Sequence, residues 1–375
     1  MPAEHNRQEL DPPAPASSVP PPVGAPPEKP ATKRADDPDV VARIDALLKE
    51  FGADPATFNA RLVRELIQTG LKLIPDGRDT GELKLISTAV KEMRYAYRVF
   101  GQYRDPHKVS IFGSARTPVG HPDYIAARDF GQIMAQKGWM VITGAGDGIM
   151  KAGHEGPGRE ASFGVAIRLP FETTANEVIA GDDKLIHFRY FFTRKLMFLS
   201  QSEAVALFPG GFGTMDEAFE ALTLIQTGKS SMIPIVMCEG AGQTYWEEFD
   251  AAMRKLLLAR GWISPEDLNL YRICKTPQEA ADHIYAFYRV YHSSRYVKDD
   301  LVIRIKRPLK PEDVERLSDE FKVLIKTNST SPAKIIQRGP FEVEDDHLTL
   351  PRLSFPHTRY KFGMIRKLID RINEC

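Results

Sequence analysis

Residues 203–217 read EAVALFPGGFGTMDE, and this segment restricts the possible folds more than any other part of the chain. The apolar run over 204–208 predicts a buried strand, the Pro-Gly-Gly turn ends it, and an amphipathic helix is expected from about Met215. A strand, a glycine turn and a helix in this order aim backbone N–H groups at one place, which favours binding of an anion, most often a phosphate. Glu217 is then expected in the first helical turn. Two explanations of this carboxylate are open. It has a functional role beside the predicted phosphate site, or it only stabilises the helix, since the helix dipole favours acidic residues in any first turn.

The same alternation of strand and helix extends over residues 106–292. Apolar strands are expected at 108–112, 139–143, 163–167, 185–188, 204–208 and 233–237, and helices at 124–136, 193–200, 246–258 and 277–291. This pattern predicts an α/β fold, a Rossmann-like, doubly wound and mostly parallel sheet with helices on both faces. Glycine turns at 113, 144–148 and 210–213 follow three of the strands, so we expect them to meet in one site at the carboxyl edge of the sheet.

The rest of the chain divides around this region. A length of 375 residues suggests two or three domains. Residues 1–37 are a Pro/Ala-rich tail, expected to be disordered, and residues 38–105 a helical lead-in whose apolar stripes are interpreted as core. The core domain is assigned to 106–292. Residues 293–375 are expected to form a small α+β accessory domain, with strands at 301–305 and 333–336 and helices at 312–325 and 362–372.

Composition excludes several classes of protein. The 50 basic and 50 acidic residues give no net charge, which argues against nucleic acid or an anionic membrane as the partner. No apolar run approaches the roughly 18 residues of a membrane span, and the N-terminus lacks the apolar core of a secretory signal. The cysteines, Cys238, Cys274 and Cys375, form no CxxC pair. We therefore expect a soluble, cytoplasmic protein with no metal and no cofactor.

Two nucleotide-binding signatures fit the sequence poorly. Residues 227–231 (TGKSS) imitate the end of a P-loop. However, Thr223 stands where the P-loop requires its first glycine, and the segment is expected at the end of a helix instead of after a strand. Residues 144–148 (GAGDG) lack the glycine that a dinucleotide fingerprint needs at Ile149.

Two histidines carry no predicted chemistry. The only His-Lys pair, at residues 107–108, precedes the first strand, at the opposite edge from the expected site, so a pyridoxal-phosphate lysine is not supported. His154, just after the second glycine turn, is interpreted as a polar surface or capping residue.

Four motifs, in chain order, resemble those of the Lonely-guy (LOG) family. They are Gly113-Ser114, residues 144–150, residues 192–197 and residues 209–217. The family is often mislabelled as lysine decarboxylases, and its characterised members are nucleoside 5′-monophosphate phosphoribohydrolases. The resemblance covers residues 106–250. Phe192 stands where the family often has a histidine, and Asp147 where smaller residues are common, which bears on substrate preference more than on reaction type.

The resemblance implies that Arg194 and Glu217 are the catalytic pair. Cleavage of an N-glycosidic bond builds positive charge on the ribose, which a fixed carboxylate stabilises while it orients water. Arg194 could grip a phosphate or pair with Glu217, and its structural alternative is an ordinary surface arginine. The predicted phosphate- and nucleotide-binding residues are Gly113, Ser114, Gly144, Gly146, Gly148, Met150, Lys195, Gly210, Gly211, Gly213 and Thr214.

The first functional prediction is hydrolysis of nucleoside 5′-monophosphates to free base and ribose 5-phosphate, by a homodimer or higher homo-oligomer. AMP is the substrate expected first, and cytokinin nucleotides follow if the base pocket admits an N6 substituent. The alternatives are a non-catalytic nucleotide sensor and a ribose-phosphate transferase. An aromatic cluster around Arg194 is open to three interpretations, as base pocket, dimer interface or core; it comprises Tyr190, Phe191, Phe192 and Phe198.

Overall fold

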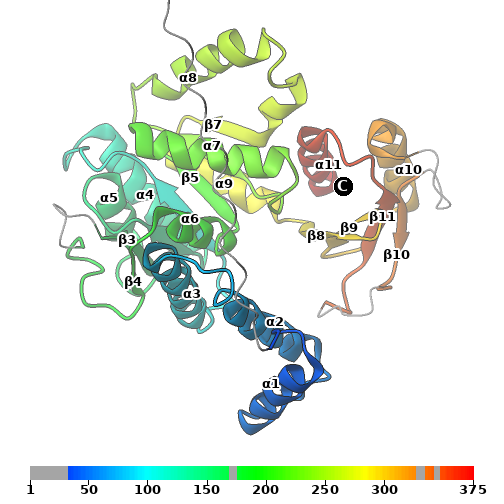
Figure 1. Cartoon of the computed structure of the whole chain (residues 1–375). Coiled ribbons are helices and arrows are strands. Elements are labelled where there is room, and N and C mark those ends of the chain that lie inside the picture. The colour runs from blue at the N-terminus through cyan, green and yellow to red at the C-terminus, as the bar shows by residue number, and fades with distance from the viewer. Residues whose placement is uncertain (1–32, 169–174, 327–333, 342–346) are drawn as a thin grey trace, which may run out of the picture. The chain divides into compact units, whose positions relative to one another are not determined.

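The computed structural model describes residues 33–168, 175–326, 334–341 and 347–375 (Figure 1). The predicted disordered tail therefore lies outside the described residues, apart from residues 33–37. The chain divides into two compact units with the boundary between Thr88 and Ala89, inside helix α3 (Thr80–Phe100).

The first unit contains α1 (Pro38–Glu50), α2 (Phe58–Lys72) and the start of α3. Its small core consists of Ile44, Leu48 and Ala60. The expected helical lead-in is present as α1, α2 and α3, but α2 leaves apolar side chains such as Leu66 exposed. The prediction that the whole apolar stripe is core is wrong, because α1 and α2 bury only the sides that face each other.

The second unit contains a seven-stranded sheet in the order β4-β3-β2-β1-β5-β6-β7. All six neighbouring pairs are parallel. The strands are β1 (Lys108–Phe112), β2 (Met140–Thr143), β3 (Ser162–Ile167), β4 (Leu185–Phe188), β5 (Ala204–Leu207), β6 (Ile235–Cys238) and β7 (Tyr271–Cys274). The predicted doubly wound parallel sheet is confirmed, with β7 as an edge strand that the sequence did not indicate.

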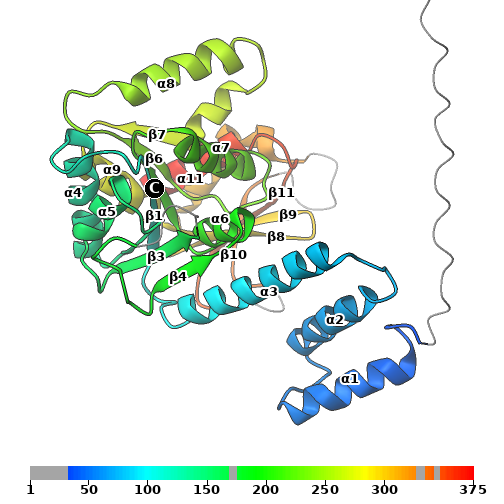
Figure 2. The same cartoon turned by 60° about the vertical axis from the view of Figure 1, so that its left-hand side comes forward.

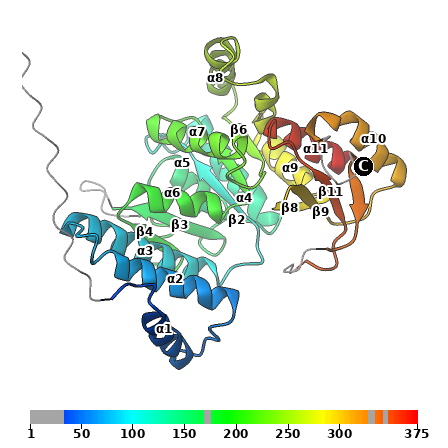
Figure 3. The same cartoon turned by 45° about the vertical axis from the view of Figure 1, so that its right-hand side comes forward.

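Helices cover both faces of this sheet (Figure 2). On one face α4 contacts both α5 and α9, and the other face carries α6 and α7. Their bounds are α4 (Pro122–Gln136), α5 (Ile149–Glu155), α6 (Phe191–Ser200), α7 (Phe212–Gln226) and α9 (Pro277–Phe287). Helix α8 (Tyr245–Met253) continues into a π-helical turn (Arg254–Leu258) and extends from the sheet edge in Figure 3. Because every residue of β1, β2, β5 and β6 is buried, these strands need apolar side chains on both faces.

A four-stranded antiparallel sheet with two helices follows, in the order β10-β11-β9-β8. Its elements are β8 (Tyr291–Val297), β9 (Asp300–Ile305), α10 (Pro311–Glu320), β10 (Ile336–Arg338), β11 (Arg352–Pro356) and α11 (Phe362–Glu374). A 3-10 turn, Lys322–Leu324, follows α10, and another, η2 (Pro265–Leu270), packs against α11. The predicted mixture of strands and helices in residues 293–375 is confirmed, and this region belongs to the same compact unit as the parallel sheet.

Several predicted boundaries in this region are wrong. The helix expected over 277–291 ends at Phe287, and Tyr291 already belongs to β8. The helix expected to reach residue 325 ends at Glu320. The short strand expected from residue 333 begins at Ile336, and residue 333 lies outside the described residues. Among the described residues, no helix combines the length and the apolar character that crossing a membrane requires.

Candidate functional site

The three predicted glycine turns meet at the carboxyl ends of the adjacent strands β1, β2 and β5. Ser114 joins them, since its amide donates to Pro209 O at 3.1 Å and its carbonyl accepts from Ile149 N at 3.0 Å. A side chain at Gly148, which has a φ of 61°, would overlap the Ser114 carbonyl. A Cβ at Gly210 would lie 2.9 Å from Ser114 N. These two glycines are therefore required for the turns to pack backbone against backbone.

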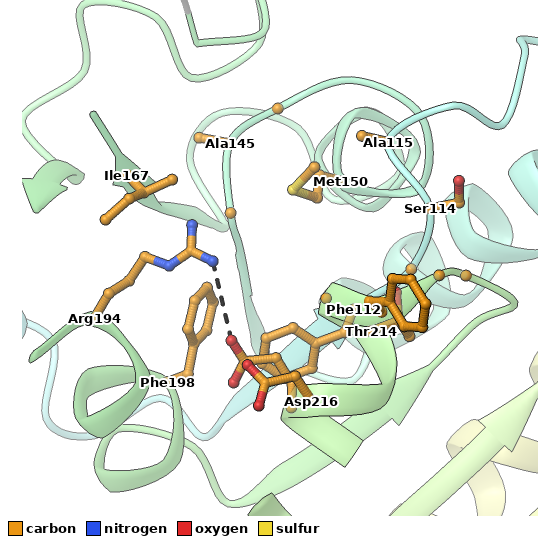
Figure 4. Close-up of a pocket in the computed structure, with 18 of the residues that line it drawn as sticks. Phe112, Ser114, Ala115, Ala145, Met150, Ile167, Arg194, Phe198, Thr214 and Asp216 are labelled. Carbon is orange, nitrogen blue, oxygen red and sulfur yellow. Dashed lines mark ion pairs between the residues drawn. The ribbon is translucent and has the colours of Figure 1, made fainter. Parts of the chain in front are cut away.

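The turns surround a cavity of about 1210 Å³ (Figure 4). Arg194 enters it from one side, Ser114 and Thr214 lie on the other side, and Ala115 and Met150 lie between them. The predicted site residues that line it are Gly113, Ser114, Gly144, Gly146, Met150, Arg194, Gly210, Gly211, Gly213, Thr214 and Glu217. Of the predicted set, Gly148 and Lys195 do not line the cavity.

Lys195 instead joins α6 to α7. Its Nζ lies 2.7 Å from Asp216 Oδ2 and 2.9 Å from Glu220 Oε2. These two ion pairs link α6 to α7. The structure gives Lys195 a role between helices and gives Gly148 a steric one.

Glu217 lies in the second turn of α7. The helix begins at Phe212, three residues before the predicted start, so the prediction that Glu217 occupies the first turn is wrong. The dipole effect fades beyond the first turn and does not account for this residue. Glu217 is only 5% exposed, and its Oε2 has no hydrogen-bond partner among the described residues. Burial raises the pKa of its carboxyl to about 7, although Lys195 and Arg194 act in the opposite direction.

Arg194 faces this carboxylate from α6. Its Nη2 lies 4.0 Å from Glu217 Oε1, the ion pair dashed in Figure 4. The guanidinium carbon is 5.2 Å from the centre of the Phe191 ring and 5.6 Å from that of Phe198, so two aromatic faces flank the cation. With a side chain 15% exposed, Arg194 is not an ordinary surface arginine.

Glu92 of α3 holds the start of α6. Its carboxylate accepts a hydrogen bond from Arg189 N at 2.6 Å and another from Thr193 Oγ1 at 2.7 Å. Thr193 is buried and immediately precedes Arg194. The helix that carries the arginine is thereby fixed from outside the sheet.

The turn at residues 209–214, which we name the signature turn, leaves backbone amides open to the cavity. A Cβ at Gly211 or at Gly213 would meet no atom within 4 Å, so local packing does not require glycine at either position. Phe212 between them is 97% exposed. Because α7 begins at Phe212, the N–H groups of its first turn have no acceptor within the helix. This arrangement suits an anion at the helix N-terminus.

His154 is a buried structural residue, which corrects the prediction of a surface or capping role. Its Nε2 lies 3.0 Å from both Phe163 O and Thr143 Oγ1, and its Nδ1 accepts from Asn176 Nδ2 at 3.2 Å. Burial lowers the pKa of the imidazole to about 4. The Thr143 hydroxyl in turn accepts from the amide of Ala145, which has a left-handed φ of 64°. Through Thr143, the histidine thus helps to hold the glycine turn at residues 144–148 in place.

The cavity also has a wall that the sequence did not indicate. This wall comes from the ends of β3 and β4 and from the start of α8, which carry no glycine motif. Its residues include Ala166, Ile167, Arg168, His187 and Tyr245.

The aromatic cluster around Arg194 divides between several environments. Phe198 is buried in the cavity wall, and Phe191 lines the cavity while half-exposed. Phe192 is exposed and stacks on Tyr190, with ring centres 5.6 Å apart. In the described part of the chain, no group of three or more His, Cys, Asp or Glu side chains is arranged to hold a metal ion.

Fold and site together define an α/β protein in which glycine turns and a carboxylate–guanidinium pair share one cavity at the carboxyl edge of a parallel sheet. The family model described as "possible lysine decarboxylase" matches residues 144–284. The chain is 31% identical over 143 residues to the cytokinin riboside 5′-monophosphate phosphoribohydrolase of Mycobacterium tuberculosis, which covers 37% of this chain and 73% of that protein. The chain therefore belongs to the LOG family of nucleotide phosphoribohydrolases.

Similar solved structures include two molybdenum-cofactor proteins. The carrier protein from Chlamydomonas reinhardtii is 20% identical, with a TM-score of 0.34 over 48% of this chain and 96% of that one. The binding protein from Rippkaea orientalis is 21% identical, with a TM-score of 0.34 over 49% and 97%.

Proposed function

We propose that the protein hydrolyses nucleoside 5′-monophosphates to free base and ribose 5-phosphate. One observation carries the proposal: the buried Glu217 carboxylate and the Arg194 guanidinium, 4.0 Å apart, share a cavity with the open amides of the signature turn. The activity named for the mycobacterial relative supports the same reaction. A protein that only bound phosphate would have no need of a buried carboxylate beside it.

In this proposal the phosphate binds at the glycine turns. The amides of Gly211 and Gly213 and the hydroxyl of Thr214 are its donors, with Ser114 beside them. The remaining cavity-lining residues of the predicted set, Gly113, Gly144, Gly146, Met150 and Gly210, shape the nucleotide site. The ribose then lies across Glu217, and the base extends toward the side lined by Ala145 and Ile167.

Glu217 acts as the ionised group. As the bond from C1′ to the base nitrogen breaks, positive charge develops on the ribose, and the adjacent carboxylate stabilises it. The carboxylate also orients a water molecule, whose oxygen bonds to C1′ while its proton goes to the departing base. Arg194 favours the charged form of Glu217, against the effect of burial, and contacts the phosphate or the ribose hydroxyls.

The finer points of the proposal rest on the family resemblance. AMP is the first substrate to test, followed by cytokinin nucleotides, and a homodimer in the cytoplasm is the expected form of the protein. Residues 106–292 are the proposed catalytic domain, 38–105 its helical lead-in and 293–375 the accessory domain. A nucleotide sensor is the alternative.

The test is to incubate the full chain with AMP, IMP, GMP, CMP, UMP and isopentenyl-AMP and to separate the products by chromatography. We expect release of free base from at least one monophosphate, no release from the matching nucleoside, and loss of release in Glu217→Gln. The matched control is Glu160→Gln, which removes an exposed carboxylate after α5. Nucleotide binding without any base release would overturn the hydrolase and support the sensor.

A further inference from the structure

Tyr245 reaches the signature turn from a different part of the fold. It is the first residue of α8, which follows β6, whereas the turn follows β5. Its hydroxyl donates a hydrogen bond to the carbonyl oxygen of Gly210 at 2.6 Å, and its side chain lines the cavity.

This hydrogen bond fixes the orientation of one peptide group. In a trans peptide the C=O and the N–H point in opposite directions. With the Gly210 carbonyl held by Tyr245, the Gly211 N–H points away from the tyrosine, and within the described residues it donates no hydrogen bond. The group is free to act as a donor to a ligand.

Among the described residues, no backbone hydrogen bond of the turn holds the Gly210 carbonyl in place. Glycines flank this peptide on both sides, so both torsions that change when it reverses are unusually free. Reversal would move φ of Gly211 from its observed −91° to the positive region and bring a carbonyl oxygen to where the N–H had been. A carbonyl in that place repels an anion instead of binding it.

We propose that Tyr245 is a positioning residue, whose hydroxyl holds the peptide between Gly210 and Gly211 with its N–H available to the phosphate of the substrate. The inference rests on the proposed function, since it concerns the phosphate end of that site. The tyrosine ring is held separately, because it packs edge-on against buried Trp246 with ring centres 4.9 Å apart. Replacing Tyr245 with Phe therefore removes the hydroxyl and keeps the packing.

The test measures binding of ribose 5-phosphate and of inorganic phosphate by calorimetry, together with kcat and KM for the best monophosphate. In Tyr245→Phe we expect affinity for both phosphate ligands to fall about tenfold, the loss of one hydrogen bond to a charged group, with an unchanged melting temperature. Tyr285→Phe, which removes a hydroxyl from an exposed tyrosine on α9, is the matched control.

A double variant separates positioning from a general structural role. An alanine at 211 meets no atom within 4 Å but opposes positive φ, so it disfavours the reversed peptide. The loss caused by Tyr245→Phe should be several-fold smaller in a Gly211→Ala background than in the unchanged chain.

Binding and turnover keep the two proposals distinguishable. Unchanged phosphate affinity in Tyr245→Phe, an equal loss with and without Gly211→Ala, or no phosphate binding by the unchanged chain would each overturn the role of Tyr245. Absence of base release with the expected loss of phosphate affinity would overturn only the hydrolase.

Discussion

The Arg194 guanidinium lies 4.0 Å from the Glu217 carboxylate, and yet burial raises the pKa of that carboxyl to about 7. An arginine so close would by itself lower the pKa of its partner. The cost of removing Glu217 from water therefore exceeds the attraction of the two cations on α6. Burial makes the ionised form of Glu217 unfavourable when no substrate is bound. Positive charge that develops on the ribose in the transition state of glycosidic cleavage would stabilise this ionised form.

The first prediction concerns this pair. Glu217→Gln and Arg194→Ala should each lower the rate of base release by about a hundred- to a thousandfold, because a preorganised charge is lost. Steady-state kinetics on the best monophosphate would measure the loss, with circular dichroism to show that the variants are folded. Near-normal turnover in either variant would contradict the assignment.

The pH dependence of turnover follows from the same carboxyl. Only the ionised form can stabilise positive charge, so kcat/KM should rise with pH and reach half of its plateau near pH 7, the pKa that burial gives Glu217. An ordinary exposed glutamate would place this point between pH 4 and 5. A profile that is already flat from pH 5 upward would mean that Glu217 is not the titrating group.

The fold could be predicted from the sequence where the strands are buried on both faces, because such strands are continuous apolar runs. The apolar runs of β1, β2, β5 and β6 predict strands directly, and the rule that ligands bind at the carboxyl ends of parallel strands brings their glycine turns together. No comparable pattern marks β8 and β11, because YHSSRYV and RLSFP mix polar and apolar residues on sheet faces that meet different neighbours.

The site was only partly predictable for a related reason. Arg194 and Glu217 belong to recognisable motifs, whereas Tyr245 and His187 enter the cavity from elements that carry none. The start of α7 was placed too late because glycine at 213 is a poor helix former. The ion pairs of Lys195 with α7 depend on how two helices pack, which no local pattern contains.

The glycines of the signature turn should respond differently to alanine. Gly210→Ala places a Cβ against the Thr214 side chain and 2.9 Å from Ser114 N, so it should lower stability by about 1–3 kcal/mol through overpacking. Gly213→Ala meets no atom and lies in a helix, so stability should be unchanged or higher by about 0.5 kcal/mol. Thermal and urea unfolding of the two variants would check the order, and equal losses would contradict it.

His154 should make the fold sensitive to acid. Its imidazole has a folded-state pKa of about 4 against about 6.5 unfolded, so only the unfolded chain takes up the proton between these values. The stabilisation that the neutral His154 imidazole gives to the fold is present above pH 6.5 and is lost as pH falls toward 4. The stability difference between the wild type and His154→Gln should shrink over this range by about 3 kcal/mol. Urea titrations at pH 7 and pH 4.5 would measure it, and a constant difference would argue against a neutral buried imidazole.

Lys195 should act on the reaction through the pKa of Glu217. The lysine carries the largest of the charge effects that lower this pKa, and it pairs with Asp216 and Glu220, whose own charges raise it. Lys195→Met removes the cation and leaves the carboxylates, so the pH at which kcat/KM reaches half of its plateau should move upward from about 7. The matched control, Lys229→Met, removes an exposed lysine just after α7 and should leave the profile in place. If Lys195 instead bound the phosphate, the variant would raise KM at every pH without moving the profile, and the two roles are distinguished by that difference.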